Sequence, residues 1–349
     1  MDRCKMLVKP RKLRKGDTIG LISPSSPLAA MLPYKVEKGT QTLEEMGFKV
    51  IVAENALKRR EHAAGTPRER ADDIHAMFAN PEVKAVICFI GGFHSNQVLK
   101  YLDFDLIRKN PKIFMGFSDI SVLHLALNTQ ANLVTFYGPA VLTQFAEAFG
   151  MPSYTIESFK KVLMSTEPVG KVFPSTEWTD ELLNWFAKAD LERPRNMKKN
   201  IGYKWLKEGK CTGEITGGCI TSILHLRGTK YWPDVKGKIF FWELPESSAD
   251  LSKGEPPARI DAHLTDLELS GVFNQCVGML IGRPKGYTDE QVKQLEEIIK
   301  ERTEGYNFPI LFNIDIGHTD PIMTLPIGVK AGLDSKSNTF EILEAAVTA

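Results

Sequence analysis

Reactive side chains occur in this sequence at three places where an apolar run gives way to a turn. The first is Gly116–Asp119 (GFSD), which follows a short apolar run and precedes an apolar, helix-like stretch. A serine on such a turn projects its hydroxyl group outward, and the N-terminus of the following helix favours developing negative charge. Ser118 is therefore a candidate nucleophile. Because Ile120 stands where a G-x-S-x-G motif has its second glycine, a plain helix N-cap explains the segment about as well.

The second place is the glycine pair Gly91 and Gly92, directly after the apolar run 83–90. Glycines at the carboxyl end of a parallel strand allow a backbone N–H group to approach a ligand closely. The pair therefore predicts half of an oxyanion hole, the set of donors that stabilises a negatively charged reaction intermediate. An ordinary tight turn is the alternative explanation.

The third place combines a carboxylate with an imidazole. Glu243 ends the apolar run 238–243 (KIFFWE), where a carboxylate needs a partner, and His318 lies in the loop 315–321 (DIGHTDP). A buried glutamate that accepts a hydrogen bond from an imidazole fixes the tautomer of the ring and stabilises its charged form. The chain order Ser118, Glu243, His318, with each residue near the end of a strand, predicts a serine hydrolase. A structural role is the alternative for any single histidine.

The first half of the chain predicts a scaffold that brings such strand ends together. Apolar runs typical of strands alternate with runs typical of helices. Thr66 followed by Pro67 is a typical helix start. Alternating apolar strands and helices predict a parallel sheet that is covered on both faces. The expected strands span 17–23, 48–53, 83–90 and 113–116, and the expected helices span 35–46, 66–77 and 119 to about 128.

The pattern changes after this half, and we expect three parts: an N-terminal domain over 1–165, a connecting segment over 166–208 and a C-terminal domain over 209–349. The connecting segment contains Trp178 and Trp185, and tryptophans argue against disorder. The last part mixes short strands with helices, which predicts a smaller, mixed α/β and partly barrel-like domain. Its expected strands span 238–243, 278–281, 310–312 and 339–343, and its expected helices span 260–270 and 289–302.

Composition narrows the class of protein. Of the 349 residues 43% are hydrophobic and 25% are charged, and the formal net charge is +1, all of which are typical of a globular protein without a nucleic-acid or anionic-membrane partner. No apolar run approaches the roughly 20 residues that cross a bilayer. The basic start contains Arg3 and Lys5, but Asp17 and Pro24 interrupt the apolar segment that a signal peptide would need. We therefore expect a cytoplasmic protein.

The five cysteines, among them Cys4 and Cys88, are scattered and form no CxxC pair. An odd, scattered set predicts reduced thiols rather than a disulfide framework, and it predicts no zinc site.

Several motifs occur in an order that resembles the LD-carboxypeptidase family. The resemblance extends from about residue 10 to residue 345. It is carried by GDTIG at 16–20, SPSSP at 23–27, AGT at 64–66, RADD at 70–73, MFANPEVKA at 77–85, GGF at 91–93, GFSD at 116–119, GTKYW at 228–232, Glu243, GRP at 282–284 and GHT at 317–319.

The resemblance implies a two-domain enzyme, usually a homodimer, that uses neither a metal nor a cofactor. A flavodoxin-like N-terminal domain would carry the nucleophile, and the C-terminal domain would carry the glutamate and the histidine. Ser118 would attack a carbonyl carbon, His318 would take the proton of Ser118, and Glu243 would orient His318. The backbone N–H groups of Gly92 and Asp119 would form the oxyanion hole.

Two specificities compete within such a family. The classical activity removes a terminal D-amino acid from a murein tetrapeptide, whereas the microcin C immunity-type activity cleaves the amide between an aspartyl group and a modified nucleotide. The aromatic connecting segment favours the second, with Trp185 stacked on a nucleobase, although Trp185 packed at a domain interface is an equal alternative. We expect Gly91 and Cys219 to contact the substrate too. Cys219 stands where the family often has Asn, which changes the hydrogen bonds offered there.

Two other classes of protein remain as alternatives. A catalytically weak protein that sequesters a peptide or nucleotide conjugate would fit the Cys219 departure, but such a binder needs no base beside a nucleophile. A glutamine-amidotransferase-like enzyme would use a cysteine nucleophile, and Cys88 lies inside an expected strand rather than on a turn.

Overall fold

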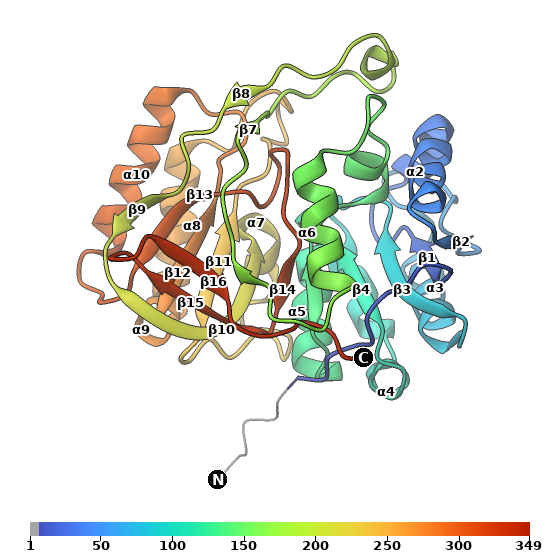
Figure 1. The fold of residues 1–349 in the computed structure, drawn as a ribbon, viewed down its shortest axis with the longest axis horizontal. Coiled ribbons are helices and arrows are strands. Elements are labelled where there is room, and N and C mark those ends of the chain that lie inside the picture. The colour runs from blue at the N-terminus through green and yellow to red at the C-terminus, as the bar shows by residue number, and fades with distance from the viewer. Residues whose placement is uncertain (1–6) are drawn as a thin grey trace.

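The computed structural model describes residues 7–349, so Arg3, Cys4 and Lys5 lie outside the described residues. Two large β-sheets stand side by side, with helices packed around and between them (Figure 1). The predicted α/β class is therefore confirmed.

The N-terminal sheet is a flavodoxin-like sheet. Five of its strands run parallel in the order 2-1-3-4-5, which is the flavodoxin-like order, and β14 from the C-terminal part of the chain pairs antiparallel with β5 at the edge. Across the sheet the strands are β14 (Leu325–Ile327), β5 (Thr135–Tyr137), β4 (Ile113–Gly116), β3 (Val83–Cys88), β1 (Thr18–Ile22) and β2 (Lys49–Val52).

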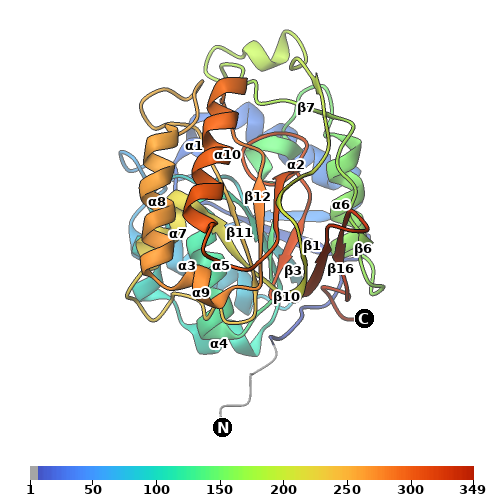
Figure 2. The same ribbon diagram turned by 90° about the vertical axis from the view of Figure 1, so that its left-hand side faces the viewer.

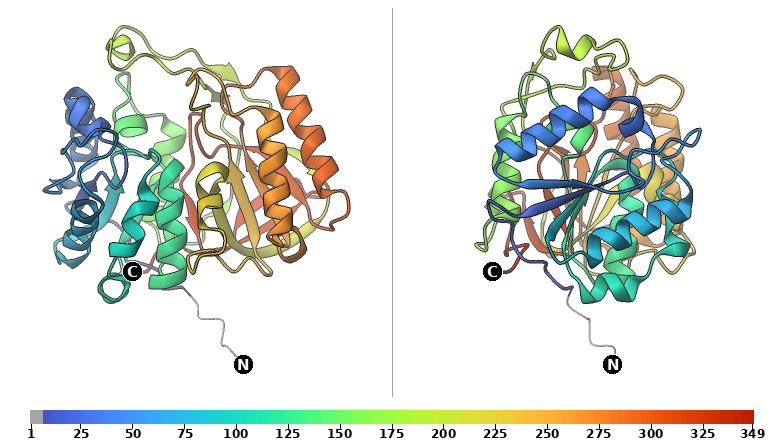
Figure 3. Two further views of the ribbon diagram at one scale, coloured as in Figure 1. Left: turned by 180° about the vertical axis from the view of Figure 1, so that it is seen from behind. Right: turned by 90° about the vertical axis from the view of Figure 1, so that its right-hand side faces the viewer.

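Helices cover both faces of this sheet, as the alternating pattern predicted. One face carries α2 (Pro33–Glu45) and α6 (Ser153–Leu163), with the short α1 (Leu28–Met31) leading into α2; the other carries α3 (Pro67–Ala79), α4 (Phe104–Lys109) and α5 (Ser121–Ala131) (Figure 3). The start of α3 agrees with the sequence. Thr66 and Glu69 form a capping box in which each side chain accepts from the backbone N–H of the other.

The order of the strands determines where a ligand can bind. The chain goes from β1 to its neighbour β2 on one side, and from β2 it returns to β3 on the other side of β1. In open α/β sheets ligands bind beyond the carboxyl ends of the strands at such a switch point. The loops 23–27 and 89–94 follow β1 and β3, and Ser118 follows β4. The topology thus collects the candidate serine and the candidate glycines at one edge.

The C-terminal part combines strands and helices, as predicted, and its sheet has eight strands within the described residues. Its central strands run parallel and its outer strands antiparallel. The helices α8 (Pro257–Leu269) and α10 (Asp289–Thr303) pack side by side against it (Figure 2), and α7 (Ile220–Ile223) and α9 (Val272–Gln275) are short. Across the sheet the strands are β6 (Gly170–Lys171), β16 (Thr339–Ile342), β15 (Lys330–Asp334), β10 (Lys210–Cys219), β11 (Ile239–Glu243), β12 (Gly278–Gly282), β13 (Ile310–Ile314) and β9 (Lys204–Lys207).

The segment 166–208, expected as a connection, supplies both edge strands of this sheet, β6 and β9. Two further strands, β7 (Glu177–Trp178) and β8 (Lys198–Lys199), pair with each other. Strands of two to four residues are too short for a hydrophobic period, which is why the sequence did not predict them. Between β7 and β8 the chain arches from the C-terminal sheet toward α2 (Figure 1).

The two sheets meet around α5, which packs against β5 of one sheet and β10 of the other (Figure 3). The apolar core is continuous across this junction. β11 is buried along its whole length, including Glu243 at its end, so this carboxylate must find its partners inside the protein.

Candidate active site

Ser118 occupies a strained turn at the end of β4. Its φ of 64° lies in the left-handed region, which is uncommon for a residue other than glycine and typical of functional sites. Two hydrogen bonds hold the turn: the Ser118 N–H donates to the Tyr137 hydroxyl at 3.0 Å, and the Ser121 hydroxyl donates to the Ser118 carbonyl at 2.6 Å. The predicted helix begins with a short 3-10 turn over Ser118–Ile120, and α5 starts only at Ser121.

The structure brings Ser118, His318 and Glu243 into one chain of hydrogen bonds. His318 Nε2 lies 2.9 Å from Ser118 Oγ, and His318 Nδ1 lies 2.7 Å from Glu243 Oε2. The Glu243 side chain is fully buried and the His318 side chain nearly so. A proton can pass from the serine to Nε2 in this geometry while the carboxylate holds Nδ1–H and stabilises the resulting imidazolium.

Electrostatics adjust the basicity of His318. Burial alone lowers the pKa of an imidazole, but the carboxylates of Glu243 and Glu246 outweigh it and raise the pKa of His318 above its ordinary value, while Lys285 opposes them. The hydrogen bond from Nδ1–H to Glu243 adds to the increase. The imidazole is therefore a stronger base than it would be in water.

Tyr137 is a site residue that the sequence analysis missed. Its hydroxyl donates to Glu243 Oε1 at 2.5 Å and accepts from the Ser118 N–H, so it joins the carboxylate to the Ser118 turn. Burial and the nearby Glu243 raise the pKa of Tyr137 well above its ordinary value, which keeps the phenol protonated as a donor. The sequence analysis predicted no strand over Thr135–Tyr137, so it had no reason to single out this tyrosine.

The glycine pair lies where the sequence analysis placed it. A Cβ atom on Gly91 would lie 3.0 Å from Ser118 Cβ and 3.2 Å from the backbone nitrogen of Asp119. Gly92 has a φ of 147°, and a Cβ atom there would lie 2.6 Å from the Ser25 hydroxyl oxygen. The loop after β3 therefore needs glycine in order to approach the serine turn this closely.

The Asp119 side chain fastens the loops that surround the serine. Its Oδ2 atom accepts from the Ser25 hydroxyl at 2.6 Å and from the Ser95 N–H at 2.9 Å. Arg70 reinforces the same loops, because its buried guanidinium donates to the carbonyls of Pro24 and His94. Arg70 and Ser25 lie in motifs that the sequence analysis noted only for their resemblance.

Cys219 lies beside Glu243 rather than in open space. The two residues are register partners in β10 and β11, and the Cys219 side chain is buried. Its N–H donates to Ser121 Oγ at 2.8 Å, and its sulfur lies 3.4 Å from the Thr221 hydroxyl. Burial and the Glu243 charge raise the pKa of the thiol well above its ordinary value, so the thiol stays neutral.

Cys88 is fully buried inside β3, and burial likewise raises the pKa of its thiol well above its ordinary value. This placement argues against a cysteine nucleophile of the amidotransferase kind.

Trp185 packs against the N-terminal domain. Its ring is half-buried, with the Lys35 ammonium 4.5 Å from the ring centroid, and its carbonyl oxygen accepts from the Tyr34 hydroxyl at 2.8 Å. These contacts dock the connecting segment onto α2. They agree with the packing role that we weighed against nucleobase stacking.

Within residues 7–349 no three His, Cys, Asp or Glu side chains are grouped as a metal ion would require. In the same range no helix is long and apolar enough to span a membrane.

Comparison with known proteins identifies the family. Residues 19–138 match the model of the LD-carboxypeptidase N-terminal domain, and residues 212–333 match the model of the LD-carboxypeptidase C-terminal domain. The chain belongs to the LD-carboxypeptidase family. This member is accordingly a hydrolase of the serine-type carboxypeptidase class, as the sequence predicted.

Relatives of this LD-carboxypeptidase family member carry both of the competing names. It is 31% identical over 337 residues to the microcin C7 self-immunity protein MccF of Escherichia coli, and this alignment covers 95% of this chain and 94% of the relative. It is 33% identical over 343 residues to a probable murein peptide carboxypeptidase of Bacillus subtilis, and this alignment covers 97% of this chain and 95% of the relative. The solved structure of MccF in complex with aspartyl sulfamoyl adenosine superposes with a TM-score of 0.88 at 30% identity, over 98% of this chain and all of that chain.

Proposed function

We propose that this protein hydrolyses the amide bond between an aspartyl-like acyl group and a modified nucleotide, with Ser118 as nucleophile, His318 as general base and Glu243 as the residue that orients His318. The observation that carries the proposal is the continuous chain of hydrogen bonds from Ser118 Oγ through His318 to Glu243. A pure binding protein would not need a raised-pKa imidazole at a strained serine.

The proposed reaction proceeds in two steps. Ser118 Oγ attacks the carbonyl carbon while its proton moves to His318 Nε2, and the backbone N–H groups of Gly92 and Asp119 receive the oxyanion. His318 then gives the proton to the leaving nitrogen, the C–N bond breaks, and an ester to Ser118 remains. Water, deprotonated by His318, attacks this ester and releases the acid together with free Ser118.

The choice of substrate rests on the relatives and on the connecting segment. MccF has been solved with aspartyl sulfamoyl adenosine, and the match to it extends along 98% of this chain. The arch between β7 and β8 places Trp185 beside α2, where an aromatic face could receive a base. Gly91 beside Ser118 and Cys219 beside Glu243 are proposed to contact the acyl part of the substrate.

Murein tetrapeptide cleavage is the second candidate. It is favoured by the 33% identity to a probable murein peptide carboxypeptidase. It is also favoured by the Lys35 ammonium over the Trp185 ring, because an indole that packs on Lys35 has a packing role rather than a nucleobase to bind.

The test is turnover of aspartyl sulfamoyl adenosine and of a murein tetrapeptide, side by side, by the purified protein. Ser118→Ala serves as the control and should lose turnover of both while its melting temperature stays unchanged. Wild-type activity in Ser118→Ala would refute the mechanism, and preference for the tetrapeptide would move the protein to the second candidate. Under the first, Trp185→Ala should impair cleavage of the conjugate far more than cleavage of the peptide.

A further inference from the structure

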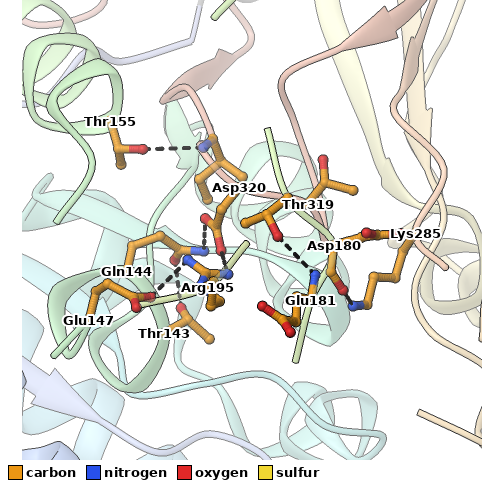
Figure 4. A network of polar contacts seen from close by, with 12 residues as sticks. Thr143, Gln144, Glu147, Thr155, Asp180, Glu181, Arg195, Lys285, Thr319 and Asp320 are labelled. Atoms are coloured by element: carbon orange, nitrogen blue, oxygen red, sulfur yellow. Dashed lines mark hydrogen bonds and ion pairs between the residues drawn. The ribbon is translucent and has the colours of Figure 1, made fainter. Parts of the chain in front are cut away.

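A largely buried cluster of charges ties the connecting segment to the loop that carries His318 (Figure 4). Arg195 of the segment contacts Asp320 Oδ2 at 2.7 Å with one nitrogen and Glu147 Oε2 at 2.8 Å with another. Gln144 completes the cluster, because its amide donates to the other Asp320 oxygen at 2.9 Å. All three ionised side chains are less than a fifth exposed.

Asp320 lies two residues beyond His318, and the segment holds its backbone as well. The Thr179 N–H donates to the Asp320 carbonyl at 2.7 Å, and the Asp320 N–H donates to the Thr179 carbonyl at 2.8 Å. The His318 loop is thus fixed on one side by Glu243, through the ring, and on the other by the segment, through Asp320. Figure 4 shows Arg195 between the Asp320 carboxylate and the Glu147 carboxylate.

The charge balance of the cluster makes Arg195 the essential member. Two carboxylates face one guanidinium, and Lys285 and Lys35 lie farther out. Burial raises the pKa of Glu147, although the Arg195 charge opposes this. Without the guanidinium, the two carboxylates would lose the cation that they share and would repel each other. Because Asp320 belongs to the His318 loop, we expect this repulsion to displace that loop.

We infer that Arg195 is a positioning residue for the base, holding His318 within hydrogen-bonding distance of Ser118 by anchoring Asp320 to Glu147. The inference rests on the proposed roles of Ser118 and His318, and it assigns a catalytic purpose to the connecting segment. The distance of 2.9 Å between Nε2 and Oγ leaves little tolerance. A displacement of about 1 Å at such a site can lower the rate about 100-fold without changing how the substrate is held.

The test compares Arg195→Ala with Arg193→Ala, a matched control in the same segment whose guanidinium binds the more exposed Glu181. With the substrate that the wild type turns over, we expect Arg195→Ala to lower kcat about 100-fold while KM changes little. Guanidinium chloride, at concentrations far below those that unfold the protein, should restore part of the kcat that Arg195→Ala has lost. Arg193→Ala should keep wild-type kcat.

A substrate-free measurement separates this inference from the proposed function. In protein labelled with 15N-histidine, the Nδ1–H signal of His318, assigned with His318→Gln, should broaden through exchange with solvent in Arg195→Ala and stay sharp in Arg193→Ala. Asp320→Asn, which keeps the side-chain shape, should broaden the His318 signal in the same way. This variant replaces Arg195→Ala in the test if Arg195→Ala does not fold. An unchanged His318 signal in both cluster variants, with unchanged kcat, would overturn the inference. Failure of the Ser118→Ala control would instead refute the proposed function and leave the histidine signals to decide the role of Arg195.

Discussion

Removing the Tyr137 hydroxyl by Tyr137→Phe tests whether Glu243 and the serine turn act as one unit. The phenol donates to Glu243 Oε1 at 2.5 Å and accepts from the Ser118 N–H at 3.0 Å, and both the ring and the carboxylate are buried. Phenylalanine fills the same space, so the substitution removes two hydrogen bonds and creates almost no cavity.

The expected cost follows from the two contacts. A hydrogen bond to a charged group contributes about 1.5–3 kcal/mol, and a buried N–H group left without an acceptor costs about 1–3 kcal/mol. Together we expect Tyr137→Phe to lower the free energy of unfolding by roughly 3–5 kcal/mol, a substantial part of the 5–15 kcal/mol typical of folded proteins. Glu243, with one donor fewer, would also attract the His318 proton more strongly, so the pKa of His318 should rise further.

Two assays check these expectations. Urea denaturation measures the free energy of unfolding, and kcat/KM as a function of pH should show an acid limb moved to higher pH. Tyr306→Phe is the matched control, because it removes a phenol that donates to the carboxylate of Glu268 at 2.8 Å near the surface. The reasoning would be wrong if Tyr137→Phe lost no more stability than Tyr306→Phe and kept the wild-type pH profile.

Two further predictions follow from the same contacts. His318 must be neutral to accept the serine proton, and its pKa lies above the ordinary value, so kcat/KM should fall as pH drops through a midpoint above about 6.5. Glu246→Gln removes one of the charges that raise this pKa and should move the midpoint to lower pH. An unmoved midpoint would contradict the assignment of His318 as the base. Gly317 has a φ of 94°, and a Cβ atom there would lie 2.2 Å from Glu243 Oε2. Gly317→Ala should therefore abolish turnover and lower the melting temperature, whereas Gly305→Ala, with nothing within 4 Å, should do neither.

Much of the N-terminal half could be predicted because its signals are local. Apolar runs bounded by turns predict β1, β3 and β4, and Thr66 with Pro67 predicts the start of α3. The position of Ser118 between a strand and a helix is likewise local, and so is the glycine pair after β3. The boundary of α5 was missed because the strained turn at Ser118 first forms a 3-10 helix.

The sequence alone, through its local patterns and its resemblance to a family, determined the α/β class, the flavodoxin-like sheet, the enzyme class and the residues worth testing. The proposed homodimer, the cytoplasmic location, the division at 165 and 208 and the exact substrate stay predictions. The tertiary structure alone decided that β14 joins the N-terminal sheet, that Tyr137 links Ser118 to Glu243, and that Arg195 holds Asp320. The physical reason is distance along the chain: these contacts join residues 19 to 192 positions apart, and a pairing of that kind depends on how whole elements pack, which no local pattern records.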